Sequence, residues 1–190
     1  AKAVLDNTVI VFTSDHGDGI GEHQWNQKTC LYEVVVRVPM IVRPPGGVEP
    51  STSDTLVNNS IDLMPTILDY AGVEAPEGMA GRSLRPAVEG NGDGPDDAVL
   101  QTRFWAPHSH GTLGRAVVGR KWKYVVYQWG AHREQLFDLE NDPGEMVNLV
   151  DFHGAREVLT ERRSTLKQWA EATQDRFARF IPAPESPGVS

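Results

Sequence analysis

The sequence predicts an α/β fold, in which strands and helices of a larger mixed sheet precede a small four-stranded antiparallel sheet with a packed helix. The β-branched and aromatic run at residues 7–14 is typical of a strand buried on both faces of a parallel or mixed sheet. Four short strand-like segments between residues 98 and 138 are joined by short turns, which favours antiparallel pairing. The amphipathic residues 155–175 predict a final helix that packs against this sheet.

Three more elements are predicted after the first strand. Residues 29–36 predict a short helix capped by Thr29, and residues 38–43 predict a second apolar strand that the following Pro-Pro-Gly-Gly stops. Residues 61–71 predict a helix that begins after the capping Ser60 and ends at a glycine. Its apolar side chains fall on one face at helical spacing: Ile61, Met64, Leu68 and Ala71.

A surface linker is predicted at residues 89–97, where Gly, Pro and Asp dominate the composition. The four strands that follow are expected at residues 98–104, 115–118, 122–129 and 134–138, with a hairpin turn at residues 119–121.

The final helix has one apolar side and one charged side. Its predicted apolar residues are Val158, Leu159, Leu166, Trp169 and Ala170. We assign Arg162 and Arg163 to its solvated face, and residues 182–187 to an extended tail.

Composition excludes some classes of function. The 190 residues carry a formal net charge of −8, which argues against nucleic acid as the main partner, because phosphate neutralisation needs clustered Lys and Arg. No apolar run approaches the roughly 20 residues of a membrane span. The single cysteine, Cys30, allows no intrachain disulfide.

The residues that carry chemistry begin where the first strand ends. Asp15 and His16 join a carboxylate to an imidazole at the carboxyl end of a predicted α/β strand, where ligands usually bind. For an isolated pair, a capping Asp beside a solvent-facing His is the more common arrangement. Here this context favours Asp15 and His16 as a pair of metal ligands, because further polar residues follow within one short stretch. They are Asp18, Glu22, His23, Lys28 and Glu33.

Three segments, in order along the chain, carry a family resemblance. They are residues 13–33 (TSDHGDGIGEHQWNQKTCLYE), residues 61–84 with IDLMPTIL, AGV and GRSL, and residues 134–149 with EQLFDL, DPGE and NL. Together they resemble the C-terminal part of the type I sulfatases, which belong to the alkaline phosphatase superfamily. The resemblance implies that residues 1–90 are the C-terminal part of an α/β catalytic domain with an alkaline-phosphatase-like mixed sheet. It also implies that residues 98–180 are a C-terminal α+β subdomain.

The resemblance also assigns roles to individual residues. Asp15 and His16 match two ligands of a divalent metal, and Lys28 matches a catalytic lysine that binds the sulfate group and stabilises its charge. His23 is a candidate for substrate binding, although a surface or supporting histidine is at least as common. His108 and His110 lie in a loop bounded by Pro and Gly, which is either an ordinary surface loop or a specificity loop at the pocket mouth.

The sequence departs from the family at the nucleophile. Sulfatases use a formylglycine made in a C/S-x-P-S-R motif, and no such motif follows Cys30, for which we expect a structural role. The chain begins at Ala1 and enters a strand almost at once, so we expect the formylglycine and two further metal-binding aspartates in upstream sequence. This segment alone should therefore be inactive.

The function implied for the whole protein is metal-dependent hydrolysis of a sulfate monoester on a small molecule or saccharide. Calcium is the metal that the resemblance favours, whereas the nitrogen donor of His16 leaves manganese and zinc open. Two alternatives remain: a phosphonate monoester or phosphodiester hydrolase of the same superfamily, and a noncatalytic domain that retains the fold. The expected macromolecular partner is the N-terminal part of the catalytic domain.

Overall fold

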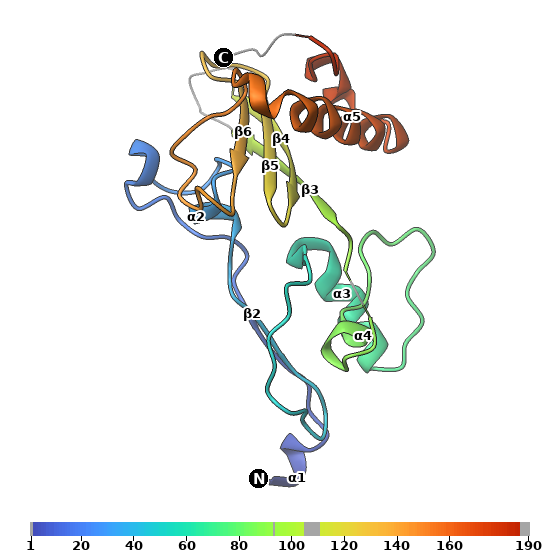
Figure 1. The fold of residues 1–190 in the computed structure, drawn as a ribbon. Coiled ribbons are helices and arrows are strands. Elements are labelled where there is room, and N and C mark those ends of the chain that lie inside the picture. The colour runs from blue at the N-terminus through green and yellow to red at the C-terminus, as the bar shows by residue number, and fades with distance from the viewer. Residues whose placement is uncertain (1, 93, 105–110, 187–190) are drawn as a thin grey trace. The chain divides into compact units, whose positions relative to one another are not determined.

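The computed structural model describes residues 2–92, 94–104 and 111–186, and the chain forms two compact units (Figure 1). The first unit comprises Ala1–Gly17 and Arg37–Asp96, and the second comprises Asp18–Val36 and Asp97–Ser190. Residues 18–36 lie with the second unit, although the sequence-based boundary groups them with residues 1–90. None of the described helices is long and apolar enough to cross a membrane.

The first unit contains a two-stranded antiparallel sheet. After helix α1 (Lys2–Leu5), strand β1 (Ile10–Thr13) pairs with β2 (Met40–Arg43), so that Ile10 lies opposite Arg43. The prediction of a strand buried on both faces is wrong for β1, because Phe12 is 60% exposed and Ile41 on β2 is 61% exposed. Within the described residues β1 has β2 as its only hydrogen-bonded neighbour, and this pair leaves apolar side chains uncovered.

Helix α3 (Asn59–Tyr70) does not bury the apolar face that its sequence pattern predicts, and it buries polar side chains instead. Ile61 and Met64 are exposed, whereas Asp62 and Thr66 are buried. The reason lies in the loop before helix α4 (Arg85–Val88), whose backbone N–H groups need acceptors. Asp62 Oδ1 accepts from Arg82 N at 3.0 Å, and Thr66 Oγ1 accepts from Leu84 N at 2.9 Å.

The ends of α3 were predicted only in part. The cap is Asn58, whose side-chain oxygen accepts from Ser60 N at 3.2 Å, so the prediction of Ser60 as the cap was wrong. The helix ends before Gly72, as predicted, and this glycine has a φ of 66°, in the left-handed region that favours glycine after a helix.

Gly81 allows the loop before α4 to approach α3. Its φ is 82°, and a Cβ at this position would lie 2.2 Å from the carbonyl oxygen of Ile61. We expect Gly81→Ala to destabilise the protein by about 2 kcal/mol more than Gly78→Ala, as judged by urea unfolding. Gly78 is the matched control because its φ is 76° and nothing lies within 4 Å of the added Cβ. Equal effects of the two changes would show that the close approach does not matter.

The second unit is built on the predicted four-stranded antiparallel sheet. Its strands are β3 (Asp97–Phe104), β4 (Thr112–Gly119), β5 (Trp122–Tyr127) and β6 (Glu134–Asp138), in the order β3-β4-β5-β6. Residues 120 and 121 form the turn between β4 and β5, as predicted. The short helical elements of this unit are η1 (Glu22–Gln24), α2 (Glu33–Val36), η2 (His153–Ala155) and η3 (Arg176–Phe180).

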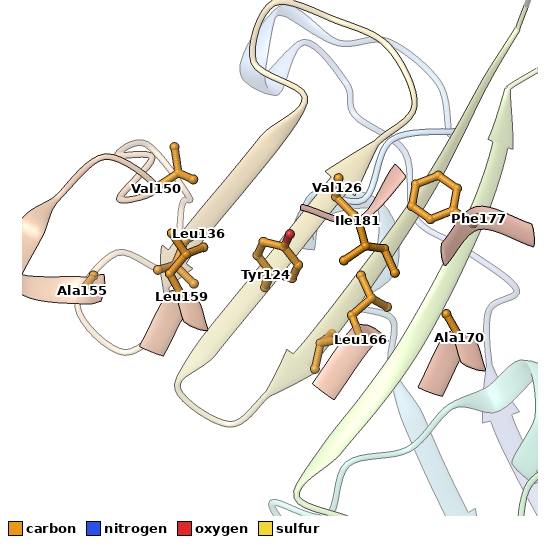
Figure 2. Packing of buried hydrophobic residues seen from close by; sticks show 11 residues of the cluster. Tyr124, Val126, Leu136, Val150, Ala155, Leu159, Leu166, Ala170, Phe177 and Ile181 are labelled. Carbon is orange, nitrogen blue, oxygen red and sulfur yellow. The ribbon is translucent and has the colours of Figure 1, made fainter. Parts of the chain in front are cut away.

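Helix α5 (Arg156–Ala172) covers one face of this sheet (Figures 1 and 2). Tyr124, Val126 and Leu136 of the strands meet Leu159 and Leu166 of the helix in one buried cluster, which Phe177 and Ile181 extend (Figure 2). The predicted apolar side of the final helix is confirmed, and this cluster is the core of the second unit.

Two local predictions for the second unit were wrong. Thr29 does not cap a helix over residues 29–36, because its φ is 95° and α2 begins only at Glu33. Arg163 is fully buried, not solvated, and its guanidinium binds the main-chain carbonyls of residues 183, 184 and 186. The described residues of the predicted tail are therefore held to α5.

Candidate functional site

Asp15 and His16 form a compact pair in the first unit, directly after β1. His16 N donates to Asp15 Oδ1 at 3.0 Å, and His16 Nε2 lies 3.4 Å from Asp15 Oδ2. The turn is tied down locally, since Ser14 Oγ donates to the His16 carbonyl at 2.8 Å and Asn59 Nδ2 donates to the Ser14 carbonyl. The Asp15 side chain is 83% exposed and that of His16 is 36% exposed, so both can meet a ligand.

The His16 ring places Nδ1 against a backbone carbonyl, which leaves the lone pair of the neutral ring on Nε2. Its Nδ1 lies 2.7 Å from the carbonyl oxygen of Gly17, and a carbonyl can only accept, so Nδ1 carries the hydrogen. In the neutral ring Nε2 is then an acceptor, and it faces the carboxylate oxygen of Asp15, which is also an acceptor. Metal-binding histidines commonly donate their second ring N–H to a backbone carbonyl in this way.

The donor set fits part of a metal site. It offers one carboxylate oxygen and one imidazole nitrogen, whereas structural and catalytic metals take four to eight ligands. Among the described residues no group of three or more His, Cys, Asp and Glu side chains could hold a metal. Asp15 and His16 alone offer too few donors for a complete metal site, and their role as metal ligands stays a prediction.

Lys28 lies in the second unit, at the end of a loop whose base is closed by hydrogen bonds to the backbone of Gln27. Gly19 N donates to the Gln27 carbonyl at 2.9 Å, and Asp18 Oδ1 accepts from Gln27 N at 3.2 Å. Gln27 and Thr29 on either side of Lys28 have φ values of 70° and 95°, which bend the chain sharply at this position. The Lys28 side chain is exposed.

His23 stacks on Tyr32 within the same unit. The ring centroids are 3.8 Å apart and the rings are within 4° of parallel. Tyr32 is held in turn by Gln135, whose Nε2 donates to the Tyr32 hydroxyl at 3.2 Å. The role of His23 in substrate binding stays a prediction.

The structure thus groups the predicted residues into two sets. Asp15 and His16 contact each other in the first unit, and Lys28 and His23 share a loop of the second. His108 and His110 lie outside the described residues. Cys30 is buried, and burial raises the pKa of its thiol, which agrees with a structural role.

Sequence analysis missed a buried ion cluster that includes Glu33, five residues after Lys28 in the chain. Lys123 of β5 lies 3.0 Å from Glu33 Oε1 and 2.9 Å from Glu145 Oε1. The sequence offered one signal for it, a lysine at an inward position of a buried strand, and such a lysine requires a charged partner.

Comparison with solved structures places the chain among the sulfatases. A protein solved in complex with its substrate D-glucosamine-2-N,6-O-disulfate is 31% identical with a TM-score of 0.80, covering 90% of this chain and 36% of that one. A phosphonate monoester hydrolase from Silicibacter pomeroyi is 26% identical with a TM-score of 0.71, covering 90% and 36%. The predicted fold class is confirmed, since sulfatases of the alkaline-phosphatase-like fold are among the structural neighbours.

Curated relatives agree with this class. The N-acetylglucosamine-6-O-sulfatase of Bacteroides thetaiotaomicron is 31% identical over 91% of this chain and 31% of its own length, so the chain spans about a third of that relative. The family model described as "N-sulphoglucosamine sulphohydrolase, C-terminal" matches residues 21–172. The chain therefore belongs to this family and corresponds to the C-terminal region of a type I sulfatase.

Proposed function

We propose that the whole protein hydrolyses a sulfate monoester on a saccharide, with a divalent metal that Asp15 and His16 help to hold. The sulfatase relatives support the reaction. The disulfated glucosamine bound by one structural neighbour supports a sugar as the substrate class. Aryl sulfates remain the useful chromogenic substrates for a first assay.

The proposal rests on one observation. His16 Nε2 lies 3.4 Å from Asp15 Oδ2, while Nδ1 of the same ring donates to the Gly17 carbonyl. Two acceptors that face each other at this distance repel unless a cation or a proton lies between them. The carboxylate suits calcium, which prefers oxygen ligands, and the imidazole suits manganese or zinc. We propose calcium, with the other two ions as the alternatives that an experiment must distinguish.

The chain's own residues then have separate roles. The bound metal would supply positive charge for the anionic oxygens of the ester. Asp15 and His16 would orient that charge, and the Lys28 ammonium would bind the sulfate oxygens on which negative charge develops. The nucleophile is not among these 190 residues by motif, so we propose that a formylglycine in a C/S-x-P-S-R sequence elsewhere in the protein performs the attack.

The test uses the full-length protein, its metal content and its release of sulfate. We expect calcium to co-purify with the protein, sulfate to be released from a 6-O-sulfated glucosamine or an aryl sulfate, and chelation to abolish this release until calcium is restored. If manganese or zinc restores sulfate release and calcium does not, the bound metal is one of those two ions and not calcium. Absence of sulfate release from a metal-loaded, formylglycine-bearing protein would overturn the function.

A phosphonate monoester hydrolase is the second candidate. It is favoured by the structural similarity to the Silicibacter pomeroyi enzyme, which covers 90% of this chain. The same preparation should be assayed with an aryl phosphonate monoester. A kcat/KM higher for the phosphonate than for the matched aryl sulfate would support the second candidate over the first.

A further inference from the structure

The two faces of the second unit's sheet have different partners. Alternate residues of β5 point to opposite faces, and Tyr124 and Val126 pack in the cluster with α5. On the other face, Val125 packs with Leu31, which is buried. Residues 29–36, which directly follow Lys28, therefore lie against the sheet face that α5 leaves uncovered.

Hydrogen bonds fix the first residues of this segment. Leu31 N donates to the Tyr127 hydroxyl at 2.8 Å, and Thr102 Oγ1 donates to the Thr29 carbonyl at 3.1 Å. These bonds join backbone groups of the segment to side chains on two strands of the sheet. Burial raises the pKa of Tyr127, so its hydroxyl stays protonated at neutral pH while its oxygen accepts from Leu31.

Glu33 is fixed by a buried ion cluster. Its backbone N–H donates to Glu145 Oε2 at 2.6 Å, and its own carboxylate lies 3.0 Å from Lys123 Nζ. The Lys123 ammonium also lies 2.9 Å from the second oxygen of Glu145. The side chain of Lys123 is 0% exposed and that of Glu145 is 1% exposed. Glu145 thus binds Glu33 in two ways, directly through the backbone and indirectly through Lys123.

Such a cluster is better suited to fixing a position than to adding stability. Buried ion pairs can often be replaced by apolar residues of similar volume without loss of stability. A charged cluster nevertheless disfavours other alignments, because any shift of residues 29–36 along the sheet would separate Glu33 from Lys123 and remove the Glu33 N–H from Glu145, so that the buried Lys123 ammonium would keep only one carboxylate partner. Apolar packing of Leu31 alone would allow such shifts.

This constraint reaches Lys28 through the chain. Lys28 is the single residue between Gln27, which closes the base of its loop, and Thr29, whose carbonyl is bound to Thr102. With both neighbours held, the backbone of Lys28 has little freedom. Its location in the second unit is therefore set by the contacts of residues 29–36.

We propose that Glu145 is a positioning residue for Lys28, acting through Glu33 and Lys123. The inference rests on the proposed function, in which Lys28 binds the sulfate group. Glu145 does not touch substrate in this proposal. Its contribution to the reaction is the fixed location of the Lys28 ammonium.

A double-mutant cycle in the full-length protein tests the coupling. We expect Glu145→Ala to lower kcat/KM for an aryl sulfate about tenfold when Lys28 is present, and less than about twofold in a Lys28→Met background. Glu145→Gln should have an intermediate effect of about threefold, because its amide oxygen can still accept from Glu33 N while the charge is lost. Asp175→Asn is the matched control, since it breaks the Arg115–Asp175 ion pair of the same unit without touching residues 29–36.

Equal losses in both backgrounds would overturn the proposal, because they would mean that Glu145 does not act through Lys28. An active enzyme that is unaffected by Lys28→Met would likewise overturn it. Hydrogen exchange of the backbone gives a readout that does not need activity, with at least about tenfold faster exchange at Leu31 and Glu33 expected in Glu145→Ala and no change in α5. If the protein releases no sulfate, the proposed function fails, and this exchange measurement alone decides whether Glu145 holds the segment.

Discussion

Asp15→Asn in the full-length protein is expected to lower kcat/KM for a sulfate ester about a thousandfold, equivalent to about 4 kcal/mol of transition-state stabilisation. The asparagine keeps an oxygen donor of nearly the same shape and removes the negative charge. The metal should therefore bind more weakly, and the amide N–H₂ group can face His16 Nε2 without repulsion. The measurements are steady-state kinetics on an aryl sulfate and metal content after dialysis.

Asp6→Asn is the matched control for this prediction. Asp6 is an exposed carboxylate of the same unit, nine residues before Asp15, and its replacement should change kcat/KM less than about twofold. Excess metal should restore part of the activity of Asp15→Asn if the loss lies in metal binding. Full metal content together with full activity in Asp15→Asn would refute the assignment of Asp15 as a ligand.

The local part of the candidate site was predictable from the sequence. The β-branched run before Asp15 predicts a strand, and the glycine after His16 predicts a turn. Both patterns place the side chains of Asp15 and His16 together at the end of a strand. The β4–β5 hairpin and the apolar side of α5 were predictable for the same reason, because each depends on neighbours within a few residues.

Features that depend on distant residues were not predictable. The burial of β1 was predicted from a continuous apolar run, and the apolar face of α3 was predicted from periodicity. Neither pattern shows what covers those side chains in the folded protein. In α3 the buried face was decided by Arg82 and Leu84, whose backbone N–H groups require Asp62 and Thr66. The contact between Glu33 and Glu145 joins residues 112 positions apart, and no local pattern predicts it.

Arg163 shows the same limit on a single side chain. The neighbours of Arg163 along α5 are charged, so the sequence predicts that Arg163 is solvated. Arg163 is buried instead, because it pairs with the buried carboxylate of Glu134 on β6. Its Nε and Nη2 donate to the two oxygens of Glu134 at 2.6 and 2.7 Å. Tyr124 donates its hydroxyl to the same carboxylate at 2.7 Å, and burial together with the charge of Glu134 raises the pKa of Tyr124 well above its usual value. Tyr124 belongs to the buried cluster that Figure 2 shows, and Arg163 and Glu134 are fully buried.

Arg163→Ala is therefore expected to destabilise the full-length protein by about 3–5 kcal/mol, as measured by urea unfolding of the second unit. Most of this loss comes from Glu134, which would stay buried without its bidentate partner. Glu134→Gln in the same background should recover part of the loss, because a neutral amide is less costly to bury than a charge. Arg156→Ala, on the exposed side of the same helix, should change stability by less than about 0.5 kcal/mol. A loss below about 1 kcal/mol in Arg163→Ala would mean that water reaches Glu134 and that the network contributes little to the core.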